Sequence, residues 1–391
     1  MKKFQYYSPT QVIFGQGTFK EIGRSVVQYG KRALLVEIEG PLEELGVFKQ
    51  AIELMEEQGV TVFEQRGVTA NPHLTIVDQG IQLVKTEKIE VIVAVGGGSS
   101  IDTAKAIAIG AASEKDVWSF FTGKYEPLAT LPVVAVSTIA ASGSEMSCHC
   151  ILTNDRDLDS SQWKKWALHH ERLFPKTAII DAELTVSVPR KLTAAGMADI
   201  NSHVLEGYFD DQLTNNALGD YLAEAVVKTI LENDFLLEDL SNIEARENVS
   251  WSATLAMNGI ADCGRIMKGF PCHWIQHAIG AMTNSSHGEG LAVIEPAWLR
   301  NEAKKNSQKF VRFNKNVLDL PRKENISDEA YALEGIDKLR KIYDQWGLPS
   351  TLRELGVTRE MIPKLVDEIM SNNESYEFDP EDIRVTLEDC Y

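Results

Sequence analysis

The sequence of 391 residues lacks the cysteine framework of a disulfide-stabilised protein. It has five cysteines, an odd number, and their spacing matches no disulfide scaffold. Cys148 and Cys150 flank His149, but no second Cys/His pair with zinc-site spacing accompanies them, so we interpret them as ordinary thiols. This cysteine usage predicts a protein of the reducing cytoplasm.

Positive charge and long hydrophobic runs are also scarce. Lys and Arg number 39 against 57 Asp and Glu, which gives a formal net charge of −18. Phosphate-rich surfaces need basic partners, so this charge disfavours nucleic acid and anionic membranes. No run reaches the ~18 apolar residues of a membrane span, and the first residues show no apolar signal segment. We therefore expect neither nucleic acid nor a membrane as a partner.

The first half of the chain alternates strand-like and helix-like segments. A strand that is apolar throughout, as at 91–95, is typical of a parallel sheet covered by helices on both faces. The alternation predicts an open α/β sheet. The predicted strands are 33–36, 60–63, 91–95 and 131–136, and the predicted helices are 45–58, 74–84 and 100–112.

From about Pro189 onward, apolar residues repeat at helical spacing and β-branched runs almost vanish. We predict a nucleotide-binding α/β domain at 1–185, with a parallel sheet, followed by an all-helical metal-binding domain at 186–391. The acidic stretch 374–389 is interpreted as a solvated tail or edge. The predicted helices of the second half are 192–209, 217–231, 243–263, 272–281, 290–304, 328–346 and 359–370.

Three glycines at 96–98 follow the predicted strand 91–95 directly. Glycine lets the backbone approach a phosphate, and a helix N-terminus offers N–H groups and a positive dipole end. Ser99 and Asp102 are spaced as a capping box for that helix. The common dinucleotide fingerprint is absent, because Ile101 replaces its third glycine, and no Walker loop is present. We interpret the segment as a phosphate-binding loop; the alternative is a tight turn without a ligand.

A second turn rich in Ser and Gly, 137–145, follows the predicted strand 131–136. Ser142 and Glu145 repeat the capping spacing. The carboxyl ends of parallel strands meet at one edge of a sheet, where such folds bind nucleotides. The two turns together predict a nucleotide site at that edge, although the second alone is equally consistent with a capped helix start.

Histidines in the second half form a candidate metal site. Asp199 and His203 are four residues apart in one predicted helix, and His273 and His277 in another, so each pair shares a helix face. His287 lies in a Gly-flanked loop that opens a helix. One Asp and three His form a mixed oxygen and nitrogen set for Fe(II) or Zn(II). A histidine alone is more often structural, and spacing does not decide between His273 and His277.

These residues resemble the iron-containing (group III) alcohol dehydrogenases, most closely the branch similar to butanol dehydrogenases. The step of 14 residues from His273 to His287 matches the family's third and fourth metal ligands. The resemblance covers almost the whole chain and implies a dehydroquinate synthase-like fold. The matching stretches, in the family's order, are Asn71-Pro72, 92–99 with Asp102 and Lys105, 143–146, 174–176 leading to Ile180-Asp181, 196–199 with His203, 273–277 and 284–288.

The resemblance implies a role for each candidate residue. His277 would lie beside the nicotinamide, as a proton relay or a positioning group. Asp102 would brace the glycine loop, and Lys165 would lie near the cofactor ribose. The implied metal ligands are Asp199, His203, His273 and His287, and the other implied cofactor-binding residues are Gly97, Gly98 and Ser99 at the pyrophosphate and Ser137, Thr138 and Ser142 along the cofactor site.

Two departures from the family pattern concern the cofactor. Family members often read Thr-Thr-Ala-Gly-Thr-Gly-Ser-Glu where 137–144 read Ser-Thr-Ile-Ala-Ala-Ser-Gly-Ser, which leaves the contacts at 140–142 open. The butanol branch often has Gly-Gly-Gly-Ser, which tolerates a 2′-phosphate, where 38–41 read Ile-Glu-Gly-Pro. Glu39, or alternatively Glu37, would bond the ribose 2′-hydroxyl and repel a phosphate, which favours NAD(H) over NADP(H). The alternative is a solvated loop glutamate.

The resemblance implies a metal-dependent, NAD(P)-linked alcohol dehydrogenase or aldehyde reductase for small primary alcohols such as butanol. It also implies a homodimer or a larger homo-oligomer. The alternatives are a polyol or lactaldehyde oxidoreductase of the same family, a lyase of the dehydroquinate synthase type, and a metal- or nucleotide-binding sensor. The sequence leaves the substrate and the choice between Fe(II) and Zn(II) open.

Overall fold

The computed structural model describes residues 1–159, 162–211, 215–371 and 378–391. The chain divides into two compact units. The α/β unit consists of Tyr7–Val188 with Ser241–Asn258, and the helical unit consists of Met1–Tyr6, Pro189–Leu240 and Gly259–Tyr391. Helix α9 (Ile243–Met257) therefore belongs to the α/β unit, although it lies among the helices of the second half of the sequence.

The α/β unit is built on a six-stranded parallel sheet in the order β1-β8-β5-β4-β2-β3. All six residues of the central strand β4 are buried, as expected for a parallel strand covered on both faces. The predicted open α/β sheet is confirmed. The strands are β1 (Gln11–Phe14), β2 (Arg32–Ile38), β3 (Thr61–Val68), β4 (Val91–Gly96), β5 (Val133–Ser137) and β8 (Thr177–Ile180).

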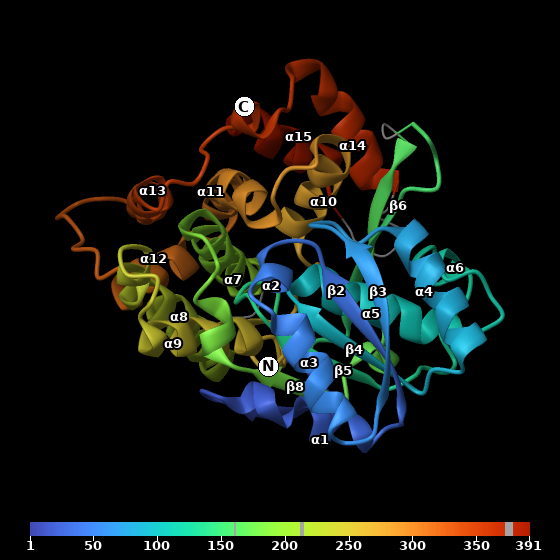
Figure 1. Ribbon diagram of the computed structural model, residues 1–391. Coiled ribbons are helices and arrows are strands. Elements are labelled where there is room, and N and C mark those ends of the chain that lie inside the picture. The colour runs from blue at the N-terminus through green and yellow to red at the C-terminus, as the bar shows by residue number, and fades with distance from the viewer. Residues whose placement is uncertain (160–161, 212–214, 372–377) are drawn as a thin grey trace. The chain divides into compact units, whose positions relative to one another are not determined.

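Helices cover the two faces of this sheet (Figure 1). Alternate residues of β4 point to opposite faces, so Val93 packs with one group of helices and Ala94 with the other. On one face lie α1 (Ile22–Val27) and α3 (Val47–Glu56), preceded by the short α2 (Pro41–Glu44); on the other lie α4 (Leu74–Glu87), α5 (Gly98–Ala111) and α6 (Trp118–Phe121).

The chain after β5 differs from the sequence prediction. The alternative interpretation of 142–145 as a capped helix start is wrong: a single 3-10 turn (Ser144–Met146) leads into an antiparallel hairpin of β6 (His149–Asn154) and β7 (Lys164–His169). The Glu145 carboxylate accepts a hydrogen bond from the Thr254 hydroxyl of α9 at 2.6 Å instead of capping a helix. The edge strand β1 and strand β8 were not predicted.

The helical unit is organised around α7 and α11. Helix α11 packs against α7, α10, α13 and α15, and α7 also packs against α8. In α7, every residue from Thr193 to Phe209 is buried, so polar side chains on this helix face the interior of the protein. The helices are α7 (Arg190–Asp210), α8 (Ala217–Glu232), α10 (Pro271–Thr283), α11 (His287–Lys305), α12 (Ser307–Asn316), α13 (Asp328–Gln345), α14 (Ile362–Ser371) and α15 (Pro380–Asp389).

Two helix predictions need correction. Helix α9 ends at Met257 rather than at 263, because Gly259 adopts a φ of +83° that helical residues do not. Residues 380–389 form helix α15 rather than a tail: Ile383 and Leu387 are buried, whereas Glu381, Glu388 and Asp389 are exposed, as expected for a solvated edge; 374–377 lie outside the described residues. In the described part of the chain, no helix is both long enough and apolar enough to span a membrane.

Candidate metal centre and phosphate-binding loops

Helix α7 places the first two candidate ligands in the interior of the helical unit. Asp199 and His203 are one turn apart and only 3% exposed. Nε2 of His203 lies 3.5 Å from Oδ1 of Asp199. The i,i+4 spacing therefore brings these side chains together as predicted.

Helices α10 and α11 bring the other two histidines to the same carboxylate oxygen. Nε2 of His273 and Nε2 of His287 lie 3.5 and 3.6 Å from Oδ1 of Asp199. The rings of His203 and His273 stack with their centroids 4.5 Å apart. The potential ligand atoms of Asp199, His203 and His273 all lie within 4.8 Å of one another. Three imidazole nitrogens thus converge on one carboxylate oxygen.

The chemistry of this donor set fits a divalent cation. Oδ1 of Asp199 and Nε2 of His273 are buried without a hydrogen-bond partner among the described residues, which is costly unless another group satisfies them. A tetrahedral cation with bonds of ~2.0–2.2 Å separates its ligand atoms by about 3.3–3.6 Å. The distances of 3.5 and 3.6 Å match that separation.

Two glycines allow α11 to approach its neighbours closely. A Cβ at Gly288 would lie 2.0 Å from the Ala195 carbonyl oxygen of α7, and a Cβ at Gly290 would lie 2.6 Å from Cγ of Gln276 in α10. Neither contact is sterically possible, so only glycine fits at these positions. This close packing brings His287, at the start of α11, to Asp199.

In two of the histidines, the ring nitrogen that points away from Asp199 is hydrogen-bonded to a residue that the sequence analysis did not identify. Nδ1 of His273 is hydrogen-bonded to Oε1 of Glu206, and Nδ1 of His287 to Oε1 of Gln276. These acceptors fix each ring so that Nε2 faces Asp199. Each acceptor lies three residues after a candidate ligand, Glu206 after His203 and Gln276 after His273, so helical spacing was the signal that could have found them.

Burial and nearby carboxylates move the pKa values of the two stacked histidines in opposite directions. Burial lowers the pKa of His203 to about 3. Burial also disfavours the charged form of His273, but the carboxylates of Glu206 and Asp199 outweigh it and raise the pKa of His273 to about 10. His203 is therefore neutral and ready to bind a cation, whereas a cation must displace a proton from His273.

His277 lies one turn after His273 on α10 and is 5% exposed. Its ring stacks on that of His287, with centroids 5.5 Å apart and an interplanar angle of 24°, and its centroid is 6.5 Å from that of His273. Neither His277 nor His287 belongs to the close cluster of Asp199, His203 and His273, but Nε2 of His287 lies 3.6 Å from Oδ1 of Asp199.

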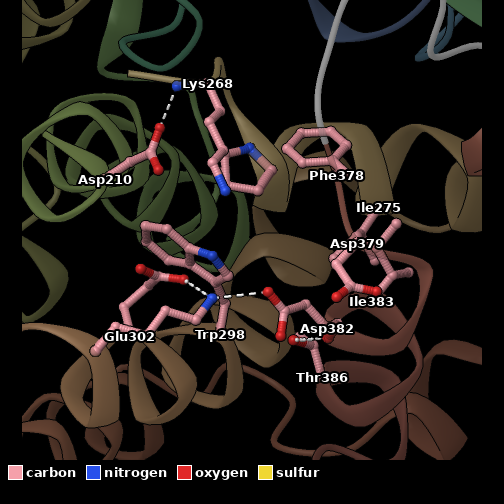
Figure 2. Close-up of a pocket in the computed structure, with 12 residues that line it drawn as sticks. Asp210, Lys268, Ile275, Trp298, Glu302, Phe378, Asp379, Asp382, Ile383 and Thr386 are labelled. Carbon is pink, nitrogen blue, oxygen red and sulfur yellow. Dashed lines mark hydrogen bonds and ion pairs between the residues drawn. The ribbon is translucent and has the colours of Figure 1, made fainter. Parts of the chain in front are cut away.

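A small cavity of about 40 Å³ lies on the other face of α10, where Pro271 and Ile275 line it (Figure 2). Residues two apart on a helix point ~200° away from each other, so His273 points away from this cavity. Acidic side chains including Asp210 and Glu302 surround it. A cavity of this size holds a few water molecules at most, so it is not a substrate site.

In the α/β unit, the two predicted turns pack against each other at the carboxyl ends of β4 and β5. A Cβ at Gly97 would lie 2.5 Å from Cγ2 of Ile139, and a Cβ at Gly98 would lie 2.5 Å from Oγ of Ser142. The Thr138 N–H also donates to the Gly96 carbonyl at 3.1 Å. A side chain at 97 or 98 would therefore have to displace the side chain of Ile139 or Ser142 in the second turn.

The start of α5 is not capped as the sequence predicted. The Ser99 hydroxyl donates to the Ala70 carbonyl at 2.6 Å, and the Asp102 carboxylate accepts from the Ser144 hydroxyl at 2.5 Å and from the Ile151 N–H at 2.9 Å. The predicted capping box of Ser99 and Asp102 is therefore wrong. Gly97 is the N-cap residue, so no capping side chain competes with a phosphate for the start of the helix.

Buried side chains tie α5 to the second turn. Nζ of Lys105 donates to the Ser144 hydroxyl at 2.8 Å and to the His149 carbonyl at 2.7 Å, and Asp102 lies beside it at 3.9 Å. Asp102 and Lys105 thus link α5 to the second turn and to the residues that follow it. The other predicted residues lie nearby in the sequence: the Ser137 hydroxyl donates to the Ile139 carbonyl at 3.3 Å, and Thr138 is buried.

Lys165, Glu37 and Glu39 complete the predicted set. Nζ of Lys165, in β7, donates to Oδ1 of Asn71 at 3.0 Å. Glu39 follows β2 with an exposed side chain, and its N–H donates to the Val68 carbonyl at 2.8 Å. Glu37, within β2, is 4% exposed. Burial and then the neighbouring Glu64 carboxylate raise the pKa of Glu37 to about 7. Of the two glutamates, only Glu39 faces solvent.

Comparisons with known proteins agree along the whole chain. Residues 9–182 match the family described as iron-containing alcohol dehydrogenase, and 193–391 match the Fe-containing alcohol dehydrogenase family, C-terminal. The chain is 35% identical over 373 residues to the probable NADH-dependent butanol dehydrogenase 1 of Bacillus subtilis (strain 168), covering 95% of this chain and 94% of the relative. It is 27% identical to the NADPH-dependent aldehyde reductase YqhD of Escherichia coli (strain K12), covering 94% and 93%. The crystal structure of NADH-dependent butanol dehydrogenase A from Thermotoga maritima matches with a TM-score of 0.93 and 33% identity, covering 100% of this chain and 99% of that one.

Proposed function

This chain belongs to the iron-containing alcohol dehydrogenase family, and from that premise we propose that it interconverts small primary alcohols and aldehydes with NAD(H). The family and the butanol dehydrogenase relatives make it an NAD(P)-linked alcohol dehydrogenase that uses a metal. A lyase or a sensor is not favoured. Butanol and butyraldehyde are the proposed substrate pair, because four relatives at 31–36% identity are named butanol dehydrogenases.

The observation that carries this proposal is the convergence of three Nε2 atoms on Oδ1 of Asp199. The proposed ligands of the cation are Asp199, His203, His273 and His287, and the proposed cation is Fe(II), with Zn(II) as the alternative. Such a cation acts as a Lewis acid on the oxygen of the alcohol or aldehyde. The chain's own part is to fix the rings of His273 and His287 through Glu206 and Gln276 and to bury Asp199, His203 and His273, while the side chain of His287 stays 27% exposed.

His277 is proposed to relay a proton or to position the nicotinamide. It is a buried imidazole whose ring stacks on that of the proposed ligand His287. An imidazole titrates in the range that alcohol chemistry near neutral pH needs. Replacing His277 with alanine is therefore expected to lower turnover while the metal stays bound, whereas His203→Ala is expected to lose the metal.

The cofactor is proposed to bind at the carboxyl ends of β4 and β5. The packed turns, the uncapped start of α5 and the hydrogen bond between Asp102 and Ser144 support a pyrophosphate site there. The exposed Glu39 supports NAD(H), since its carboxylate would repel a 2′-phosphate. The residues proposed to contact the cofactor are Gly97, Gly98, Ser99, Ser137, Thr138, Ser142, Lys165 and Glu39.

The test follows the absorbance of NADH and NADPH with butyraldehyde, using protein stripped of metal and then reloaded with Fe(II) or Zn(II). We expect no oxidation without metal, restored oxidation with it, and a preference for NADH. Glu39→Gly is the matched variant for the preference and is expected to accept NADPH better. No turnover by the reloaded protein with either cofactor would contradict the proposal.

Two further expectations stay proposals. The family resemblance supports a homodimer or a larger homo-oligomer, which light scattering on the purified protein tests. The five cysteines are all free in the structure, which supports the reducing cytoplasm as its compartment.

A further inference from the structure

The three candidate ligand histidines differ in what holds their outward-facing nitrogen. Nδ1 of His273 meets the carboxylate of Glu206, and Nδ1 of His287 meets the neutral amide of Gln276. Nδ1 of His203 is buried without a hydrogen-bond partner among the described residues. One ring therefore has a charged acceptor, one has a neutral acceptor, and one has neither.

We propose that Glu206 is a positioning residue whose negative charge makes His273 the strongest-binding histidine of the centre and sets the affinity for a divalent cation. This inference rests on the proposed metal centre. Glu206 touches neither the cation's position nor the substrate's; it acts through His273.

The surroundings of Glu206 hold its carboxylate in one direction. The residue is 0% exposed, on the same face of α7 as His203. Oε1 accepts from the Ser202 hydroxyl at 2.8 Å and from Nδ1 of His273. Oε2 accepts from the Cys272 N–H at 2.5 Å and from the His273 N–H at 3.3 Å. Four donors therefore fix both oxygens, and His273 supplies two of them.

The same carboxylate also caps α10. The N-cap residue Phe270 offers no capping side chain, and Pro271 occupies the first position of the helix. The N–H groups of Cys272 and His273 are satisfied by Glu206 of α7, whose negative charge also suits a helix N-terminus. One side chain thus determines where α10 begins and which nitrogen of His273 faces Asp199.

The charge of the acceptor changes the strength of the ligand. An imidazole whose N–H donates to a carboxylate is a more basic metal ligand than one that donates to an amide. Asp199 and Glu206 together bring two negative charges into a buried site, and a divalent cation compensates them. The difference between Glu206 and Gln276 should therefore appear in metal affinity.

A second carboxylate on the same helix, that of Asp210, provides a control for a purely structural role of Glu206. Asp210 lies one turn further along α7, and its carboxylate accepts a hydrogen bond from the Lys268 N–H, before α10 begins (Figure 2). Asp210 therefore also holds this segment of backbone, but it contacts none of the candidate ligands. If Glu206 were only a cap, Glu206→Gln and Asp210→Asn would have the same effect on metal binding.

The experiment measures the dissociation constant of Zn(II) for the full chain, stripped of metal, by competition with a chromophoric chelator, and the melting temperature with and without Zn(II). Glu206→Gln is expected to weaken Zn(II) binding 10–100-fold, as is typical when a residue that hydrogen-bonds to a metal ligand is replaced. The rise in melting temperature on metal addition should be smaller than in the wild type. Asp210→Asn is expected to stay within about twofold of the wild type. Wild-type affinity in a folded Glu206→Gln protein would overturn the proposal.

A charge swap separates the charge from the cap. Nε2 of Gln276 is buried without a partner among the described residues, so Gln276→Glu replaces an unsatisfied donor with an acceptor of the same shape. Adding it to Glu206→Gln moves the charge to His287 and is expected to recover part of the lost affinity; no recovery would overturn the electrostatic role. If Glu206→Gln does not fold, Gln276→Glu alone is expected to tighten Zn(II) binding, and unchanged affinity there contradicts the proposal. A wild type that binds no Zn(II) would instead contradict the proposed function.

Discussion

The two candidate sites are built by opposite means. The loops of the α/β unit depend on side chains that are absent, because Gly97 and Gly98 leave room for the turn of Ile139 and Ser142. The centre of the helical unit depends on side chains that are present, buried and charged, such as Asp199 and Glu206. A backbone site tolerates changes in neighbouring side chains, which explains how the turn after β5 departs from the family pattern and still packs against the glycine loop. A side-chain site does not tolerate such changes.

Removal of one proposed metal ligand should give the largest difference between the two sites. Asp199→Ala deletes the oxygen on which three imidazoles converge. Metal affinity and metal-dependent turnover are expected to fall by more than the ~100-fold typical when a residue that hydrogen-bonds to a metal ligand is replaced. Metal analysis of the purified protein measures the loss of metal. NADH binding, followed by fluorescence, should persist because no side chain of the α/β unit has changed. A variant that retains its metal would contradict the ligand assignment.

An added methyl group at Gly288 tests the close packing of α11 against α7 near the metal centre. In Gly288→Ala, the new Cβ would meet the Ala195 carbonyl 2.0 Å away, and backbone atoms cannot turn aside as a side chain can. The free energy of unfolding is expected to fall by about 3 kcal/mol, the upper end of overpacking costs. Denaturant unfolding measures this loss. Unchanged stability would mean that α7 and α11 do not approach each other this closely.

A glycine-to-alanine substitution in the α/β unit should weaken cofactor binding instead. In Gly98→Ala, the Cβ would meet the Ser142 hydroxyl, which can rotate away, so the fold should tolerate the change better. The dissociation constant of NADH is expected to rise about tenfold, equivalent to ~1.4 kcal/mol, because the methyl group enters the loop that approaches the pyrophosphate. Calorimetric titration with NADH measures the shift, and metal content should stay at the wild-type level. Metal loss in this variant would remove the distinction between the sites.

A buried carboxyl of the α/β unit should make the stability of the protein depend on pH. The pKa of Glu37 is raised from 4.5 to about 7 by burial and by Glu64, so the folded state holds a proton that the unfolded chain releases near pH 4.5. The stability of the wild type should therefore fall as the pH rises from 4.5 to 7, by on the order of 2 kcal/mol. Glu37→Gln cannot ionise and should lose this part of the pH dependence. Unfolding measured at pH 5 and at pH 8 tests it; an equal difference in both proteins would contradict the shift.

The sequence predicted what periodicity and helical spacing encode. Apolar runs located β4 and β5, and the i,i+4 spacing located Asp199 and His203. It did not predict β1 or β8, nor the partners of Asp102, which lie 42 and 49 residues away in the chain. Capping spacing was misleading at both turns, because Ser99, Asp102 and Glu145 form hydrogen bonds with residues distant in the sequence instead of capping a helix.

The choice between His273 and His277 shows the same limit. The two histidines lie one turn apart on α10, so their spacing in the sequence does not show which of them is a ligand. The structure separates them, because Glu206 turns Nε2 of His273 toward Asp199 while His277 stacks on His287. Only the resemblance to the family anticipated that difference from the sequence.

X-ray absorption at the zinc edge, on protein loaded with one equivalent of Zn(II), tests the central claim most directly. The predicted spectrum shows one oxygen and three imidazole nitrogens at ~2.0–2.2 Å, with one imidazole lost in His287→Ala and none lost in His277→Ala. A sulfur ligand, or the loss of an imidazole in His277→Ala, would contradict the assignment of Asp199, His203, His273 and His287 as the metal centre.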